Sequence, residues 1–543
     1  MVFARRSTTL LAAIIASCAM VLSLTACTSD NKTVVDGQTT VTSNSAGGVA
    51  VFTPSDGITL NQQVPLNKWA KLVPDLTKAL VDAGFKKGDI NHTTSDSLAK
   101  QSRAIQDFVV DHLSNNTTDD SGIAIAPDNM TLLVAPVVEA DASTRQYGDY
   151  VSQNLSTNDV TDEGATSDGE SSEDDSSKDD SSNTESDSTA SDEQAQAVDR
   201  LVSSLKLAEE SGMHVVLLGN SIEGYKPDAF VKFSDAQTIG KLQAEKMVSK
   251  LKLDKASKDN PKYIEVLLPY TAVDEKGNAN DSTFAQEAFR GIWQVLGSYY
   301  QKGVVESPSG TLDGKSTEND WQAVAYDAAK EGSTAKVLDK RLAKTDGQST
   351  LTRIDGIITM NDYIASEVVK ELDDLGYTGS AADINPQITI SGIVGNITGK
   401  KDLSRDAVPD PIKSPENDNA NDSSSSDDDA DEDTSASDKD RDSQWPLVTG
   451  YGAYVSNIPS IVNGKQWMTG MEDRQTIATD IAQACAKLNK DEALNSMPSI
   501  RNSEVGGVKK IPTISEPLLA VSASNLKSAL IDPGYISLAD AGL

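Results

Sequence analysis

Cysteine and histidine are both scarce in this chain of 543 residues, which has three of each. One cysteine lies in an apolar N-terminal run, so Cys27 and Cys485 are the candidates for the mature protein. Two thiols so distant in sequence exclude a disulfide framework and a cysteine-based zinc site. The histidines stand apart from one another, which favours ordinary surface or core positions over metal ligands or general bases. They are His92, His112 and His214.

Basic residues are also few, since 48 Lys and Arg stand against 82 Asp and Glu and the formal net charge is −34. This balance excludes a nucleic-acid-binding protein, because contacts with phosphates need basic patches. Most of the charge lies in two tracts, residues 159–193 with a net −13 and residues 416–442 with a net −10. Both are rich in Ser, Asp, Asn and Thr, and we expect them to be disordered acidic insertions. Neither has the residue spacing of a calcium-binding loop.

The motifs of common enzyme classes are missing as well. Residues 392–401 come nearest to a phosphate-binding loop, but Val394 and Lys401 replace its first glycine and its hydroxyl residue. Residues 219–221 lack the final glycine of a nucleophile elbow, and no histidine is placed to activate Ser221. The sequence therefore predicts a protein that is not an enzyme and that has no cofactor and no metal site.

The N-terminus has the features of a secretory signal peptide. Arg5 and Arg6 precede an apolar run over residues 10–24 that contains no acidic residue. The run ends in Leu-Thr-Ala directly before Cys27, and this arrangement resembles the bacterial lipobox. The resemblance implies that residues 1–26 are removed and that Cys27 is lipidated. Ordinary secretion with a coincidental cysteine is the alternative, and the two arginines leave the Sec and twin-arginine export routes open.

The predicted location follows from this signal. No other run of about 18 apolar residues exists, so the lipid on Cys27 is the expected membrane attachment, on the extracytoplasmic face of the cell membrane. Residues 27–47 are rich in Ser, Thr, Asn, Asp and Gly, and we expect a flexible tether there.

The remainder alternates short apolar runs with longer segments of helical periodicity. This pattern predicts an α/β fold in which buried parallel strands are followed by amphipathic helices. The expected strands are residues 48–53, 130–137, 214–218, 263–268, 354–360, 388–391 and 447–449. The expected helices are residues 69–83, 95–113, 197–211, 238–251, 284–300, 321–342 and 362–375. So many strands and helices over roughly 450 ordered residues favour two doubly wound parallel-sheet lobes, with ligands at the carboxyl ends of the strands.

Seven short segments occur in an informative order. They are Lys68-Trp69 and residues 212–218, 239–244, 288–291, 354–362, 466–474 and 511–535. Together they resemble the type I periplasmic binding proteins, most closely the xylose- and ribose-type substrate-binding lipoproteins of ABC importers. The resemblance implies two lobes joined by a hinge, with lobe 1 at residues 48–235 plus 363–464 and lobe 2 at residues 236–362 plus 465–543. It also implies capture of a monosaccharide between the lobes and delivery, by a monomer, to an ABC permease and its ATPase.

The resemblance also assigns candidate ligand-binding residues. Trp69 is the candidate for stacking on a sugar ring, and a packing role at the start of a helix is the alternative. Asn361 and Asp362 end a predicted strand at the cleft, where they bind hydroxyl pairs or, alternatively, serve the hinge or cap a helix. Four further residues lie at strand ends, in loops or at helix starts, and for each of them a loop or cap role is an equal alternative to ligand contact. They are Asn220, Asn280, Asp281 and Trp321.

Two departures from the family pattern affect which ligand we expect. Gly219-Asn220 stand where the family has an Asp-Arg pair, and Tyr451-Gly452 stand where it has Gln-Asp, so two charged groups are missing. Either the ligand differs from the usual free aldose or Asn220 and Tyr451 supply other contacts. A ligand-sensing or surface lipoprotein that kept the fold but not transport is therefore the alternative function.

Overall fold

The structure is a computed structural model in which the chain forms two compact units, Met1–Asn44 and Ser45–Leu543. The residues that it describes are 32–35, 38–41, 46–55, 65–115, 125–138, 142–156, 185–273, 280–328, 330–343, 350–381 and 444–543. Among these, no helix combines the length and the apolar character that a membrane crossing requires.

The first unit contains a β-hairpin inside the segment predicted to be a flexible tether. Strands β1 (Lys32–Val35) and β2 (Gln38–Val41) pair antiparallel, with Val35 opposite Gln38. Two β-branched runs flank an Asp-Gly dipeptide in the sequence, and this combination is a strong hairpin signal. The segment predicted to be a flexible tether therefore contains regular secondary structure over these eight residues.

The second unit contains a large, mostly parallel sheet. Its strands are β3 (Gly48–Pro54), β4 (Ile90–Ser95), β5 (Met130–Val134), β7 (His214–Leu218), β9 (Ala229–Lys232), β17 (Ile500–Val505) and β18 (Val508–Ser515). The spatial order is β17-β18-β9-β7-β5-β3-β4, and only the edge pair β17 and β18 is antiparallel. We refer to this sheet and its helices as the first lobe.

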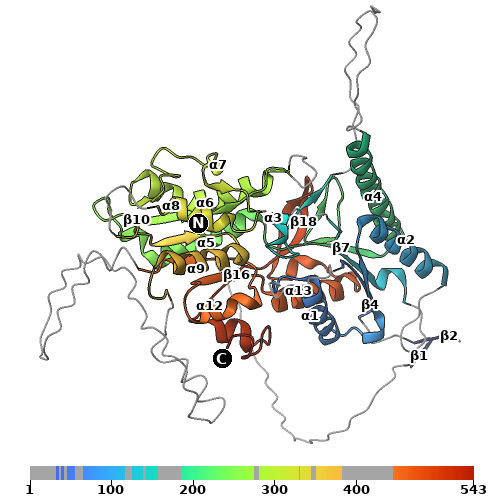
Figure 1. Ribbon diagram of the computed structural model, residues 1–543. Helices are drawn as coiled ribbons and strands as arrows, with labels where there is room; N and C mark the ends of the chain where they lie inside the picture. Colours follow the sequence, from blue (N-terminus) through green and yellow to red (C-terminus); the bar gives the residue numbers. More distant parts are fainter. Residues whose placement is uncertain are drawn as a thin grey trace, which may run out of the picture. The chain divides into compact units, whose positions relative to one another are not determined.

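Helices cover both faces of the large sheet. One face packs on α1 (Trp69–Asp82) and α13 (Arg474–Leu488), which lie side by side in Figure 1. The other face packs on α2 (Leu98–Asn115) and α4 (Glu185–Glu210). Successive strand residues alternate between the two cores, since Val49 and Val51 face α1 whereas Ala50 and Phe52 face α2. Shorter elements are η1 (Lys87–Asp89), η2 (Pro127–Asn129), α3 (Ala142–Arg145), β6 (Asn154–Leu155), β8 (Ser221–Ile222) and η5 (Leu494–Ser496).

A second parallel sheet forms the core of the second lobe. It consists of β10 (Lys262–Val266), β12 (Val305–Glu306), β14 (Gly356–Ile358) and β15 (Leu447–Thr449), in the order β12-β10-β14-β15. Its helices are α5 (Ala236–Leu251) and α6 (Thr283–Gln301) on one face, and α8 (Ser333–Arg341) and α9 (Asp362–Leu375) on the other. Shorter elements are η3 (Leu253–Lys255), β11 (Leu268–Pro269), α7 (Trp321–Val324) and β13 (Ala325–Tyr326).

The two sheets share one topology, and the predicted fold class is confirmed. In each lobe the second strand along the chain flanks the first, and the third lies on the other side of the first. The strand order therefore reverses between β3 and β5 in the first lobe and between β10 and β14 in the second. In open α/β sheets such a reversal opens a crevice at the carboxyl ends of the strands, where ligands bind.

The chain passes between the lobes at three places. Residues 234–235 lead from β9 to α5, residues 472–473 lead to α13, and residues 516–518 leave β18. Beside these crossings, β16 (Met468–Met471) pairs antiparallel with β19 (Leu519–Ser522). The remaining C-terminal elements pack in a small apolar cluster with Leu66. They are η4 (Val455–Asn457), α12 (Ile458–Val462) and the π-helix η6 (Lys527–Ile531).

The predicted lobe boundaries need correction in two segments. Strand β15 pairs with β14 and α9 packs against α8, so residues 363–375 and 447–449 belong with the second lobe and not with the first. Helix α13 packs against α1, and β18 pairs with β9, so residues 474–515 belong with the first lobe. The sequence order alone could not show these pairings, because each is made between segments that are far apart in the chain.

Two further predictions need correction. Helix α4 begins at Glu185, inside the tract 159–193 that was predicted to be disordered. The predicted helix at residues 321–342 is two helices, because Ala325–Tyr326 pairs with β11 instead. Residues 159–184, the tract 416–442, the strand predicted at 388–391 and the signal peptide lie outside the described residues.

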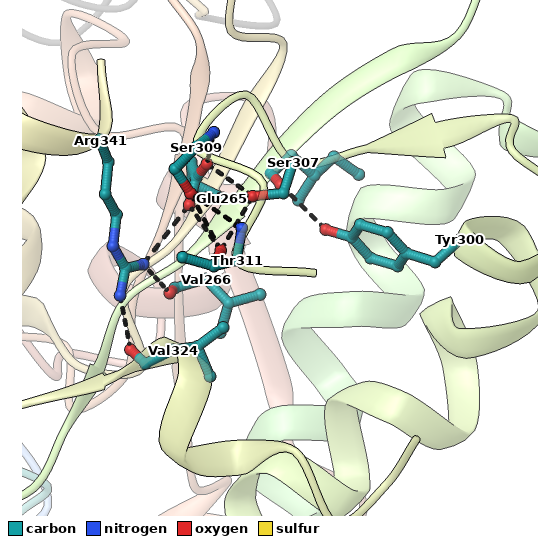
Figure 2. Close-up of polar contacts among 9 residues, drawn as sticks. Glu265, Val266, Tyr300, Ser307, Ser309, Thr311, Val324 and Arg341 are labelled. Atoms are coloured by element: carbon teal, nitrogen blue, oxygen red, sulfur yellow. Dashed lines mark hydrogen bonds and ion pairs between the residues drawn. The ribbon is translucent and has the colours of Figure 1, made fainter. Parts of the chain in front are cut away.

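A buried ion pair holds the second lobe together at the end of β10 (Figure 2). Glu265 is fully buried and accepts hydrogen bonds from the Ser307 hydroxyl at 2.7 Å and the Ser309 amide at 2.8 Å. The Arg341 guanidinium lies 3.4 Å from the same carboxylate and also donates to the Val324 carbonyl at 2.9 Å. These partners are all groups of the protein itself, which indicates a structural role.

Candidate functional site

The carboxyl ends of the two sheets meet, and side chains bond directly across the junction. Asn361 follows β14, and its Nδ2 donates to Oε1 of Gln146 at 3.1 Å. Ser234 follows β9 and Tyr451 follows β15, and their hydroxyl groups hydrogen-bond to each other. The candidate site is therefore the region between the lobes, where both strand-order reversals open.

Trp69 lies at the first-lobe reversal, at the start of the helix that follows β3. The side chain is only 2% exposed and packs edge-on against Tyr150 and Phe233, with ring centroids 5.1 and 5.6 Å away. Its backbone amide donates to Oδ2 of Asp149 at 3.0 Å. In this arrangement Trp69 packs as a core residue, which is the alternative that the sequence left open.

Asn361 lies at the second-lobe reversal and begins α9. Its Oδ1 accepts from the Ile364 amide at 2.9 Å, so the residue caps the helix while its Nδ2 reaches Gln146. Met360, just before it, has a φ of +67°, a left-handed conformation that a methionine adopts only under constraint. Strained backbone of this kind collects at ligand sites, which is consistent with a functional position.

Asp362 is fully buried and its carboxylate is saturated by the protein. Oδ1 accepts from Gln466 at 2.7 Å, and Oδ2 accepts from the Thr469 hydroxyl at 2.8 Å and the Tyr454 amide at 2.9 Å. Burial raises the pKa of Asp362 to about 6, although these hydrogen bonds lower it. A Cβ on Gly450 would lie 2.1 Å from Oδ1, so this approach requires glycine. Asp362 organises the end of β15.

Tyr451 reaches the crossing segments between the lobes. Its hydroxyl bonds to Ser234 and also donates to Oε1 of Glu472 at 3.3 Å. The Ser234 amide donates to the same Oε1 at 2.6 Å, which ties the first crossing to the second. Burial raises the pKa of Glu472 to about 7. These three residues form a polar hinge cluster beneath the junction.

Asn67 extends this cluster and was not among the predicted residues. The side chain is 1% exposed, and its Oδ1 lies 3.5 Å from the Glu472 amide that donates to it. Its Nδ2 is buried and has no hydrogen-bond partner among the residues that the structure describes. A buried donor without an acceptor is costly and rare, so it marks a position that a ligand or water oxygen fits. Its place directly before Lys68-Trp69 is the one sequence signal that could have identified it.

Asn220 joins three strand ends of the first lobe. Its Oδ1 accepts from the Gln153 amide at 3.0 Å, and its Nδ2 donates to the Pro136 carbonyl at 2.9 Å. The residue is buried and both ends of its amide are engaged with backbone, so it shapes the loops.

The remaining predicted residues lie together around β11 in the second lobe. Asn280 donates to the Thr271 carbonyl at 2.8 Å, and Asp281 accepts from the Thr283 amide at 2.9 Å at the start of α6. Trp321 is buried edge-on against Tyr270, with ring centroids 5.1 Å apart. Asn280 and Asp281 line a small pocket that also includes Tyr270 and Phe284. They shape this loop, and Phe284 connects it to the junction.

A short segment, residues 146–150, occupies the junction itself and was missed by the sequence interpretation. Tyr147 belongs to the second-lobe core, with its ring 4.7 Å from that of Phe284 and 6.3 Å from that of Tyr451. Tyr150 belongs to the first-lobe core, stacked 4.8 Å from Phe233. We call residues 146–150 the interlobe segment, because its neighbouring side chains pack into different lobes.

Two observations on the described residues concern metal binding and thiol reactivity. Within the described parts of the chain, no group of three or more His, Cys, Asp or Glu side chains could hold a metal ion. Cys485 is buried in the first-lobe core, where burial raises the pKa of its thiol and keeps it unreactive. Cys27 lies outside the described residues.

The sequence matches no protein-family model and no curated protein. Among solved structures, an ABC transporter solute-binding protein from Clostridium phytofermentans with bound β-D-glucose is 16% identical with a TM-score of 0.44, over 91% of this chain and 99% of that chain. A carbohydrate transporter solute-binding protein from Chloroflexus aurantiacus in complex with D-glucose is 17% identical with a TM-score of 0.44, over 92% and 98%. A periplasmic ribose ABC transporter protein from Conexibacter woesei is 13% identical with a TM-score of 0.41, over 90% and 96%. At these values the likeness is remote.

Proposed function

We propose that this chain is an extracytoplasmic solute-binding lipoprotein that captures a monosaccharide between its two lobes and delivers it to an ABC permease. One observation carries the proposal. The two α/β lobes have the same topology and are connected by three crossing segments. Their strand-order reversals face each other, and hydrogen bonds join the lobes there, from Asn361 to Gln146 and between Ser234 and Tyr451. Lobes connected in this way can close around a small ligand by a hinge motion.

The chemistry of the junction suits a neutral sugar. Trp69 and Phe284 supply aromatic faces for the C–H side of a pyranose ring. The unpartnered Nδ2 of Asn67 supplies a hydrogen-bond donor for a hydroxyl group. Xylose-, ribose- and galactose-like sugars combine these two properties.

The role is binding and not catalysis. Asp362 and Glu472 are the two fully buried carboxyls near the junction with raised pKa values, and both are engaged by protein donors. A general acid or base needs to reach a substrate atom, and neither carboxyl has an exposed oxygen with which to do so.

The proposed partners are the membrane, through a lipid on Cys27, and an ABC permease with its ATPase, with the chain acting as a monomer. Metabolic labelling with a radioactive fatty acid tests the anchor. The wild-type chain should carry the label and Cys27→Ser should not. A labelled Cys27→Ser protein would refute the anchor without affecting the proposal of sugar binding.

Calorimetric titration of the full chain with D-glucose, D-xylose, D-ribose and D-galactose tests the binding function. At least one sugar should bind, and Asn67→Ala should weaken its affinity about tenfold, because one hydrogen bond to a buried group is lost. Asn220→Ala is the matched control, since both ends of that amide are bonded to backbone, and its affinity should stay near that of the wild type. An unchanged affinity in Asn67→Ala would refute the assigned site.

A surface or ligand-sensing lipoprotein that does not deliver sugar is the second candidate. It is favoured by the interlobe segment, whose Tyr150 covers the ring of Trp69. Uptake of the bound sugar, labelled with carbon-14, in cells with and without the gene separates the two functions. Delivery predicts that deletion abolishes uptake, whereas sensing predicts that uptake persists.

A further inference from the structure

We propose that the interlobe segment, residues 146–150, occupies the sugar site from within the chain, and that a sugar binds by displacing Tyr147 and Tyr150. This inference rests on the proposed function. It adds that the occupied site sets which ligands bind and how tightly.

The second-lobe half of the segment fills space between the lobes. Tyr147 is 1% exposed, and its ring lies between Phe284 at the start of α6 and Tyr451 at the end of β15. Gln146 fixes the position, because its side chain accepts from Asn361 and its carbonyl accepts from the Tyr454 hydroxyl at 2.7 Å. A first-lobe segment is thereby anchored on the second lobe.

The first-lobe half covers the residue predicted to stack on a sugar. Tyr150 is 1% exposed and packs on both Trp69 and Phe233, while its hydroxyl donates to the Lys68 carbonyl at 2.5 Å. Asp149 pairs with the Lys68 ammonium at 2.8 Å and accepts from the Trp69 amide. The segment therefore uses the aromatic face and polar groups of residues 68–69 that a ligand would otherwise use.

A tyrosine side chain shares several binding properties with a sugar. Its ring is similar in size to a pyranose, it stacks on aromatic faces, and its hydroxyl hydrogen-bonds at the rim. If only a minor fraction of the molecules is in the binding-competent state, the apparent affinity for the ligand is the intrinsic affinity multiplied by that fraction.

Gly148 offers a way to shift this equilibrium without touching the aromatic residues. Its φ is +94°, and an added Cβ would lie 2.6 Å from the Asn67 carbonyl oxygen. Gly148→Ala therefore disfavours the docked segment both by backbone strain and by a collision with Asn67. Gly376 is the matched control, because its φ is also +94° but no heavy atom lies within 4 Å of an added Cβ.

The experiment is calorimetry and amide hydrogen exchange on the full chain, with Gly148→Ala and Gly376→Ala beside the wild type. D-glucose, D-xylose, D-ribose and D-galactose are the probes. Gly148→Ala should bind a sugar about tenfold tighter than the wild type, or bind one that the wild type does not, whereas Gly376→Ala should match the wild type. A saturating sugar should also speed exchange of the amides of residues 147–150.

The outcomes separate this inference from the function on which it rests. Wild-type binding with no gain in Gly148→Ala and no faster exchange would overturn displacement and leave sugar binding intact. The absence of binding by every variant would overturn both. The amide hydrogen exchange of residues 147–150 is measured in the wild-type protein. It therefore tests displacement even if Gly148→Ala misfolds.

Discussion

The ring of Tyr150 lies 5.1 Å from the ring of Trp69, and the two planes are inclined at 65°. Phe233 closes the group, 4.8 Å from Tyr150 and 5.6 Å from Trp69. Trp69 begins the helix that follows β3, at the strand-order reversal where a ligand is expected, yet its ring is covered by the protein. This contact links the stability of the first lobe to its binding site.

The first prediction concerns Trp69. Because the side chain is buried in the first-lobe core, Trp69→Ala should lower the free energy of unfolding by about 3–5 kcal/mol. Urea denaturation of both proteins measures the difference. Tyr150→Phe is the control, since it keeps the ring and removes one hydrogen bond, which should cost about 1 kcal/mol. A loss below about 1 kcal/mol in Trp69→Ala would show that the ring is not packed as described.

The second prediction concerns pH. Burial raises the pKa of Glu472 from the ordinary glutamate value of 4.5 to about 7 in the folded protein. Between pH 4.5 and 7 the unfolded chain therefore loses this proton first, so the free energy of unfolding should fall as the pH rises, by on the order of 3 kcal/mol. Glu472→Gln should flatten that slope in urea denaturation between pH 4.5 and 8.

Glu245→Gln is the control for this prediction, because Glu245 is an exposed glutamate on α5. Its slope should equal that of the wild type. If Glu472→Gln kept the full pH dependence of the wild-type free energy of unfolding, protonation of Glu472 would not be its cause.

The third prediction concerns Asp362. An asparagine there would direct an NH₂ group at one of three donors, so Asp362→Asn should lower the free energy of unfolding at pH 7 by about 1–3 kcal/mol. The difference should grow at pH 5, because burial raises the pKa of Asp362 to about 6 and protonation of this carboxyl stabilises the folded wild type, whereas an asparagine does not titrate. Denaturation at both pH values measures this, and an equal loss at both would contradict the assigned pKa.

The fourth prediction concerns the ion pair in Figure 2. Arg341→Met leaves the buried Glu265 carboxylate without its cation and should cost about 3–5 kcal/mol. Adding Glu265→Gln removes the unpaired charge and should restore part of the loss. A double variant that is less stable than Arg341→Met alone would refute the idea that the pair is held by charge compensation.

Local sequence patterns predicted the parts of the fold that local interactions determine. Strands β7 and β15 and helix α9 begin and end at the predicted residues, because continuous apolar runs and terminal glycines set these limits. Strands β4 and β9 were missed. Most residues of β4 are polar, and His92 and Thr93 are exposed, so its sequence lacks the apolar pattern that predicts a strand.

Motif order identified candidate site residues but did not predict their side-chain contacts. Trp69, Asn361 and Asp362 lie at strand-order reversals, and tertiary packing decides which of their atoms remain available. The interlobe segment has neither helical nor strand periodicity and stands before an acidic tract, so nothing in the sequence marked it. Its role follows only from which rings and carbonyls it meets in space.

Calorimetric titration of the full chain with the four sugars, repeated with Gly148→Ala, tests sugar capture most directly. We predict saturable binding of one sugar per chain, at least in Gly148→Ala. No binding heat from any of the four sugars, in either protein, would contradict the proposal that these two lobes form a sugar-binding cleft.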